Sequence, residues 1–192
     1  GDLGDHLAPF QRALTSWALR RGKAALFAAV GLGKTRMELE FGHRAIASLG
    51  RRPADVLIAT PLAVAAQTVR EAEKIGLRAK YCRTPLDIEA DAITITNYDR
   101  LDAFDIHAFP VGILDESSVI KHNTSKRRGY LIEAFRHMPF RLAGTATPSP
   151  NDRRELDRQR HRTHDRRLVL DHDFALSLIP QGNCPLPPHD PD

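Results

Sequence analysis

The sequence predicts an α/β fold, a mainly parallel sheet flanked by helices, from three observations. Short apolar runs alternate with longer amphipathic segments, which is typical of βαβ units. The first apolar run leads into Gly31 and Gly33, and a later one ends in Asp115 and Glu116. Ligands of parallel α/β sheets bind at the carboxyl ends of strands, where glycine loops and paired acids belong. The 192 residues, 42% hydrophobic and 27% charged, suffice for one globular domain with its own core.

Four amphipathic helices are predicted from apolar residues that recur at helical spacing. The first covers residues 9–21, and the second covers residues 34–49 and ends before a C-cap glycine. The third opens at Pro61, a natural first-turn residue, and the fourth covers residues 125–137. The inner faces are expected to carry, in chain order, Phe10, Leu14, Trp17 and Ala18; Met37, Phe41 and Ala45; Leu62, Ala65, Ala66 and Val69; and Leu131, Ala134, Phe135 and Met138.

The apolar runs between these helices predict the strands, at residues 24–29, 56–60, 78–82, 92–96, 111–114 and 140–144. After Asn151 the composition changes abruptly. Residues 153–167 carry seven arginines and no lysine, and residues 180–192 carry five prolines. We therefore expect residues 1–152 to form the folded domain, and residues 153–192 to form an arginine-rich arm and a poorly structured tail.

The composition argues against several classes of protein. Cys82 and Cys184 lie far apart in the sequence and form no CxxC pair, so neither a disulfide scaffold nor a cysteine metal site is indicated. We therefore expect the protein to lie in a reducing cytosol. The longest apolar stretches fall short of the ~20 residues that span a bilayer, so we expect no membrane partner. The formal charge of +4 suits an anionic partner without establishing one. Because the chain begins at Gly1 rather than Met, we expect a piece of a longer protein.

The strongest chemical signal is Gly31-Leu32-Gly33-Lys34-Thr35, placed between an apolar run and an amphipathic helix. Glycines let backbone N–H groups close around phosphate oxygens, and the helix N-terminus adds its positive end. Lys34 would neutralise the β- and γ-phosphates, and the Thr35 hydroxyl would reach Mg²⁺. An ordinary glycine turn is the alternative. The position between strand and helix favours a phosphate-binding loop.

The second signal is a pair of acids, Asp115 and Glu116, at the end of the apolar run 111–114. In a phosphate-binding enzyme, Asp115 would hold Mg²⁺ and Glu116 would orient or deprotonate the attacking water. Two acids at this place could also cap the following helix. The phosphate loop in the same chain favours the catalytic interpretation.

These motifs resemble the first RecA-like lobe of superfamily 2 helicases and translocases, over residues 7–152. Residues 28–35 resemble motif I of that superfamily, in which Ala28 at the first position is ordinary. Residues 115–118 resemble motif II. Residues 7–11 resemble the start of Snf-type translocases, where the glutamine reads adenine.

Three further segments follow the same order. Residues 145–148 resemble motif III, which couples the nucleotide state to the grip on nucleic acid. Residues 59–62 with Gln67 resemble motif Ia, and residues 95–99 resemble motif Ib, both of which contact the nucleic-acid backbone in the family. The residues of motifs II and III most resemble those of Snf-type helicases encoded by phages or prophages.

The resemblance implies a RecA-like P-loop NTPase lobe that binds ATP and Mg²⁺ in a nucleic-acid-stimulated ATPase. It implies a nucleic-acid track, with DNA favoured over RNA, a second RecA-like lobe in cis or in trans, and the cytoplasm of a bacterial or phage-infected cell. The catalytic residues would be Lys34, Asp115 and Glu116, and the metal ligands Thr35 and Asp115. The nucleotide would contact Gln11, Gly31, Leu32, Gly33, Lys34 and Thr35. Nucleic acid would contact Thr60, Pro61, Thr96 and Asn97, and the coupling residues would be Thr145, Ala146 and Thr147.

Two other functions stay open at this point. Nothing after Asn151 resembles a second lobe, so the chain could bind nucleotide or nucleic acid without turnover by itself. In related phosphoryl-transfer enzymes the arginine that such a lobe supplies accelerates turnover by about 10³–10⁵. A different P-loop enzyme, such as a small-molecule kinase, is the third possibility, and it would require the matches to motifs Ib and III to be accidental.

Overall fold

The computed structural model describes residues 4–27, 31–116 and 125–145. Six parallel strands of this part form one sheet in the order β1-β6-β5-β2-β4-β3. The strands are β1 (Lys23–Phe27), β2 (Val56–Thr60), β3 (Ala79–Tyr81), β4 (Ile93–Asn97), β5 (Val111–Leu114) and β6 (Phe140–Thr145). The predicted α/β class with a parallel sheet is confirmed. The predicted tail, residues 153–192, lies outside the described residues.

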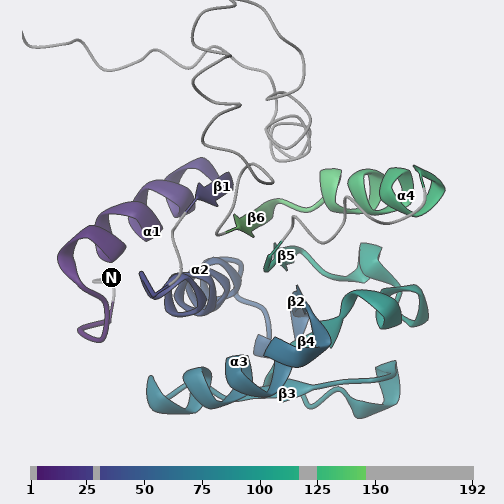
Figure 1. Cartoon of the computed structure of the whole chain (residues 1–192), viewed down its shortest axis with the longest axis horizontal. Helices are drawn as coiled ribbons and strands as arrows, with labels where there is room; N and C mark the ends of the chain where they lie inside the picture. The colour runs from purple at the N-terminus through teal and green to yellow at the C-terminus, as the bar shows by residue number, and fades with distance from the viewer. Residues whose placement is uncertain (1–3, 28–30, 117–124, 146–192) are drawn as a thin grey trace, which may run out of the picture.

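Helices cover both faces of the sheet (Figure 1). The α-helices are α1 (Pro9–Arg21), α2 (Lys34–Ser48), α3 (Leu62–Lys74) and α4 (Ser125–Arg136). Short 3-10 helices are η1 (Pro53–Asp55), η2 (Pro85–Asp87), η3 (Tyr98–Ala103) and η4 (Ile106–Ala108). Helices α1, α2 and α3 pack on one face, and α4 packs on the other with η3 and η4.

Alternation along the strands divides the interior into two cores. In β2, Val56 and Ile58 join the core beneath α1, α2 and α3, whereas Leu57 and Ala59 join the core beneath α4. All five residues of β2 are buried. A strand that is buried on both faces has a continuous run of apolar residues in its sequence. Such a run, and not an alternation of apolar and polar residues, is what predicted β2.

Helix α4 is fixed to the sheet by close packing and by a buried cation. A Cβ on Gly112 of β5 would overlap Met138 and Phe135, so only glycine lets α4 approach this closely. Arg141 of β6 is buried, and its Nη1 donates to the carbonyl oxygens of Arg136 and Met138 at the end of α4. Burial lowers the pKa of Arg141 to about 10. The guanidinium satisfies carbonyls that the helix leaves unpaired.

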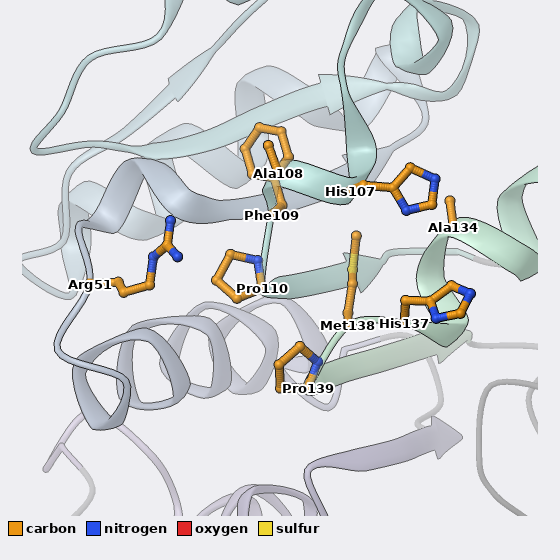
Figure 2. A pocket seen from close by; sticks show the side chains of 9 residues that line it. All are labelled: Arg51, His107, Ala108, Phe109, Pro110, Ala134, His137, Met138 and Pro139. Atoms are coloured by element: carbon orange, nitrogen blue, oxygen red, sulfur yellow. The ribbon is translucent and has the colours of Figure 1, made fainter.

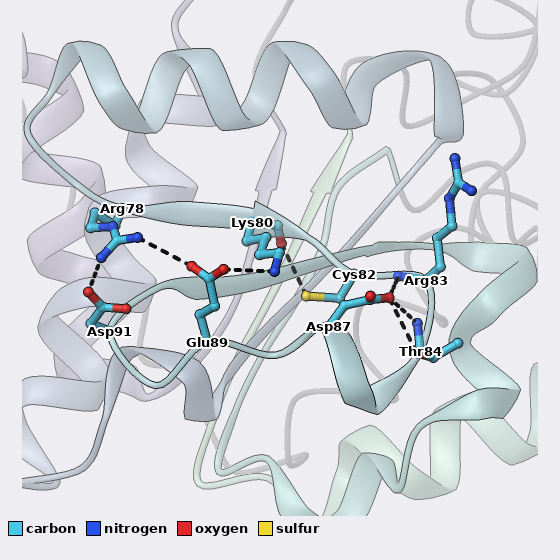
Figure 3. A network of polar contacts seen from close by, with 8 residues as sticks. All are labelled: Arg78, Lys80, Cys82, Arg83, Thr84, Asp87, Glu89 and Asp91. Carbon is cyan, nitrogen blue, oxygen red and sulfur yellow. Dashed lines mark hydrogen bonds and ion pairs between the residues drawn. The ribbon is translucent and has the colours of Figure 1, made fainter.

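The exposed edge of the sheet at β3 is lined by charged residues (Figure 3). Arg78 pairs with both Asp91 and Glu89, and Lys80 Nζ lies 2.8 Å from Glu89 Oε1. Charges along an edge strand oppose pairing with a strand of another molecule.

Two helices bury only part of the face that their apolar spacing predicts. Ala18 of α1 and Ala65 of α3 are buried as expected, and Val69 packs against the core. In α1, Phe10, Leu14 and Trp17 are 46%, 39% and 39% exposed, and the buried residues are Gln11, Thr15 and Ala18. In α3, Leu62 is 61% exposed and Ala66 is exposed, while Ala65, Thr68 and Ala72 are buried. Small side chains on the inner faces allow close approach, and Gln11 takes part in a hydrogen bond described below.

The other element predictions differ from the structure by a few residues at the ends. The predicted inner faces of α2 and α4 are buried. The strand expected at residues 24–29 is β1, described from Lys23 to Phe27, and residues 28–30 lie outside the described part. Pro61 is the N-cap of α3 rather than its first helical residue.

Candidate functional site

The candidate site lies at the carboxyl ends of the strands, where the loop after β1 meets the acids after β5. Gly31 and Gly33 have φ angles of 87° and 71°, in the left-handed region that favours glycine. Gly33 is the N-cap of α2, so the first turn of that helix begins at Lys34. Leu32 is exposed and Thr35 is half-buried. The loop therefore presents a helix N-terminus, as a phosphate-binding loop requires.

Lys34 brings the two predicted motifs together. Its Nζ lies 3.1 Å from Asp115 Oδ1 and 3.1 Å from Glu116 Oε2. Burial by itself would lower the pKa of Lys34, but Asp115, Glu38 and Glu116 raise it above its ordinary value. Lys34 therefore carries its positive charge at neutral pH and offers it to anions at this edge of the sheet.

Asp115 is buried and held from several sides. Its Oδ2 accepts a hydrogen bond of 2.9 Å from Thr60 Oγ1, and its backbone carbonyl accepts one of 2.7 Å from the Tyr98 hydroxyl. Its backbone N–H donates to Ala59 O at 2.8 Å. Burial raises the pKa of Tyr98 well above its ordinary value, so the phenol stays protonated and remains a donor. The sequence analysis did not identify Tyr98 as a site residue.

Glu116 follows with an unusual backbone conformation. Its φ of 52° makes it the one non-glycine residue of the described part with a positive φ. Non-glycine residues in this region are uncommon and cluster at functional sites. The side chain is 28% exposed, in contrast to the buried Asp115. The two adjacent acids thus face different surroundings, one enclosed and one open to solvent.

Gln11 reaches the glycine loop from α1. Its Nε2 donates to Leu32 O at 2.7 Å, and its Oε1 accepts from Ala8 N at 2.9 Å. A glutamine on an amphipathic helix is ordinarily a solvent residue, but this one is buried against the loop. The structure therefore joins the N-terminal motif to the glycine loop.

Glu38 is a further residue that the sequence analysis missed. It lies one turn after Lys34 on α2 and is 1% exposed. Burial raises the pKa of Glu38 well above its ordinary value, and the nearby Asp115 raises it further. No motif marks this position. The only signal in the sequence is an acid four residues after a lysine, which is also a common surface pair.

The residues predicted to contact nucleic acid gather at the same edge, but several are enclosed. Thr60, Thr96 and Asn97 are buried, and Pro61 is half-buried. The Thr60 hydroxyl is bonded to Asp115, and the Thr96 hydroxyl donates to Cys82 O at 2.8 Å. A shallow cavity of about 440 Å³ opens beside them, lined by Leu62, Tyr81, Arg83, Asn97, Asp99 and Arg100.

Of the predicted coupling residues, Thr145 ends β6, and Ala146 and Thr147 lie outside the described residues. The backbone of Thr145 is in register with Phe27, the last residue of β1. The beginning of the predicted coupling segment is therefore adjacent to the strand that leads into the glycine loop.

A second cavity, of about 160 Å³, lies at the opposite ends of the strands from the glycine loop (Figure 2). Pro110 and Pro139, which immediately precede β5 and β6, line it together with His107 and His137. It is separate from the glycine loop because it opens at the amino ends of the strands.

Within residues 4–27, 31–116 and 125–145, no three or more His, Cys, Asp or Glu side chains are grouped to hold a metal ion. In the same residues, no helix has the length and apolar character needed to span a membrane.

Comparison with solved structures identifies the fold. The chain is similar to the Sulfolobus solfataricus SWI2/SNF2 ATPase core in complex with dsDNA, at 22% identity and a TM-score of 0.59, over 77% of this chain and 33% of that one. It is also similar to a hypothetical ATP-dependent RNA helicase from Sulfolobus tokodaii, at 18% identity and a TM-score of 0.51, over 79% of this chain and 50% of that one.

No protein-family model and no curated protein matches the chain. The chain spans about a third and a half of the two similar structures. The described residues thus share their fold with parts of these two structures, and the glycine loop and the acid pair lie together at the carboxyl ends of the strands.

Proposed function

We propose that this chain is the ATP-binding lobe of a nucleic-acid-dependent ATPase that acts together with a second RecA-like lobe. The observation that carries the proposal is Lys34, whose ammonium lies between Asp115 and Glu116 at the end of a glycine loop. This position of Lys34 places a group suited to binding phosphate beside a carboxylate pair, at the carboxyl ends of the strands, where ligands of parallel sheets bind. In this proposal residues 1–152 form the lobe.

Lys34 would exchange its partners when ATP binds. The loop amides and the Lys34 ammonium would bind the β- and γ-phosphates, and the phosphates would draw Lys34 away from the carboxylates. Glu116, more exposed than Asp115, would then be free to orient a water molecule and accept its proton. Gln11 would select ATP over GTP from its place against Leu32.

The residues at this edge suit Mg²⁺, which prefers oxygen ligands. Asp115 offers a carboxylate whose orientation Thr60 fixes, and Thr35 offers a hydroxyl in the same helical turn as Lys34. These two side chains would hold the ion. When bound, Mg²⁺ would neutralise charge on the phosphates during transfer.

Nucleic acid would bind beside the cavity that Leu62, Tyr81, Arg83 and Arg100 line. The two arginines would contact phosphates, and the exposed Leu62 would contact the sugars. Thr60, Pro61, Thr96 and Asn97 would shape this surface. DNA is favoured over RNA, in keeping with the dsDNA complex of one similar structure.

A second candidate function is nucleotide or nucleic-acid binding without turnover. The matched region spans a third to a half of the similar structures. A RecA-like ATPase gains about 10³–10⁵ in rate from an arginine supplied across its site.

The test is steady-state ATP hydrolysis with and without duplex DNA and RNA, combined with ATP binding. A DNA-stimulated rate that is lost in Glu116→Gln while ATP binding persists would support the ATPase. Glu73→Gln, at an exposed position of α3, is the matched control and should behave like the parent. ATP binding without turnover in any condition would favour the second candidate. Absence of ATP binding would contradict the ATPase, and absence of both ATP binding and nucleic-acid binding would contradict both candidates.

A further inference from the structure

A buried carboxyl group lies behind the candidate nucleotide site without a full set of hydrogen bonds. Glu38 on α2 is 1% exposed, and its Oε1 accepts no hydrogen bond from the described residues. Leaving a buried polar atom unpaired destabilises the folded chain. Such a group in a native fold calls for an explanation, and its neighbours supply one.

The neighbours of Glu38 join two parts of the site. Lys34 lies one helical turn earlier, and Asp115, whose Oδ1 is 3.1 Å from Lys34 Nζ, helps to raise the pKa of the Glu38 carboxyl group. On the other side, a Cβ added to Gly144 of β6 would overlap Glu38 Oε1 and would lie 3.2 Å from Lys34 Cδ. The Glu38 side chain therefore fills the space between the Lys34–Asp115 pair and the backbone of β6.

At Gly144 a side chain would be opposed by this contact and not by the backbone conformation. The φ angle of Gly144 lies outside the left-handed region. Its backbone conformation would therefore accept any residue if there were space for the side chain. Gly144 is in register with Leu26 near the end of β1, and it immediately precedes Thr145, the first predicted coupling residue. The contact thus lies between the nucleotide site and the start of the coupling segment.

We propose that Glu38 is a positioning residue that links the Lys34–Asp115 pair to the end of β6 through its contact with Gly144. The inference rests on the proposed function and names the residue through which the nucleotide site would act on the end of β6. When phosphates take Lys34, the packed carboxyl group has to shift with its neighbours, because close-packed interiors have no free space to absorb the change. The end of β6 then responds to the nucleotide.

Hydrogen exchange of the backbone amides of residues 141–145, with and without saturating ATP, tests the link in the chain alone. In the parent chain, ATP should change exchange at these amides by about tenfold. Glu38→Ala, measured at an ATP concentration that saturates this variant, should lose the response in β6. Glu38→Gln, which fills the same volume, should keep it. Glu73→Ala on α3 is the matched surface control.

A size exchange tests the contact directly. Gly144→Ala should push Glu38 towards Lys34 and weaken ATP binding by about tenfold or more. The double variant Glu38→Ala with Gly144→Ala should restore binding, because the added methyl group then occupies space that the carboxyl group vacates.

The outcomes separate this inference from the proposed function. If the parent chain does not bind ATP, the proposed function fails. If the parent binds ATP but β6 does not respond, or if Glu38→Ala responds like the parent, the inference is overturned while the function stands. A Glu38→Gln variant that behaves like Glu38→Ala, or a double variant no better than Gly144→Ala, would also overturn it.

Discussion

At the scale of single residues, the central arrangement is a buried acid fixed from several directions. Asp115 receives hydrogen bonds at its carboxylate from Thr60 and at its carbonyl from Tyr98, and it faces Lys34. A carboxylate held in one orientation is preorganised for a ligand, which is how active sites gain from supporting residues. Thr60 and Tyr98 therefore act through Asp115.

The Tyr98 hydroxyl offers the cleanest test of this support. Tyr98→Phe removes a buried hydrogen bond to Asp115 O and leaves the ring, so we expect a loss of about 1–3 kcal/mol in the free energy of unfolding. Urea denaturation followed by circular dichroism measures it. Tyr81→Phe, at a half-buried tyrosine, is the control. Equal stability of Tyr98→Phe and the parent would show that the hydroxyl does not support Asp115.

The sequence predicted Lys34, Asp115 and Glu116 as one site because parallel strands bring their carboxyl ends to one edge. It did not predict Tyr98 or Glu38. Their roles depend on which neighbour each side chain meets across the sheet, and no local pattern records that.

At the scale of elements, α1 shows why periodicity is an incomplete guide. Apolar residues at helical spacing identified the helix, but Leu14 and Trp17 face outward and Thr15 and Ala18 face inward. The spacing of residues gives the period of a helix, whereas the buried face depends on packing against α2 and on the hydrogen bond from Gln11 to Leu32.

A pair of substitutions tests this orientation of α1. Leu14→Ala should lower the free energy of unfolding by less than about 1 kcal/mol, because the side chain is exposed. Phe41→Ala, in the core face of α2, should lower it by about 3–5 kcal/mol. Urea denaturation measures both. A loss at Leu14 as large as that at Phe41 would place the apolar face of α1 in the core.

The segment before α1 is attached to α2 through Glu40. Glu40 Oε1 accepts hydrogen bonds from Gly4 N at 3.1 Å and Arg44 Nε at 2.8 Å, and its Oε2 lies 3.4 Å from His6 Nε2. Burial alone would raise the pKa of Glu40, but the bonds from Arg44 and Gly4 outweigh it and lower the pKa below 4.5.

A lowered pKa makes this attachment dependent on pH. The ionised Glu40 stabilises the fold above its ordinary pKa, and the contribution is lost as the pH falls through its lower folded-state value. Glu40→Gln should therefore be less stable than the parent by about 1–3 kcal/mol at pH 7, and the difference should shrink in acid. Urea denaturation across this range measures it. A difference that stays constant with pH would show that the charge of Glu40 makes no contribution.

At the scale of the whole molecule, the sheet order places the glycine loop and the acid pair on the two sides of β6. Strand β6 lies between β1 and β5, so its end is next to the loops that follow both neighbours. The described residues share their fold with parts of the two similar structures, which extend well beyond the matched region. In the proposed function, a second lobe would complete the ATPase site.

The positions of the inner strands were predictable because both faces of the sheet are covered, so a strand such as residues 56–60 is an apolar run. The order of the strands was not predictable from such runs. It depends on which strands pair, and the place of β6 between β1 and β5 appears only in the folded chain.

The most direct test of the central claim is equilibrium binding of ATP, with Mg²⁺ present, to the parent chain, to Lys34→Ala and to Lys74→Ala. Lys74 is an exposed lysine at the end of α3 and serves as the matched control. We expect the parent and Lys74→Ala to bind alike, and Lys34→Ala to lose at least about tenfold in affinity, because it removes the cation that faces the phosphates. Binding by Lys34→Ala as tight as by the parent would contradict the claim.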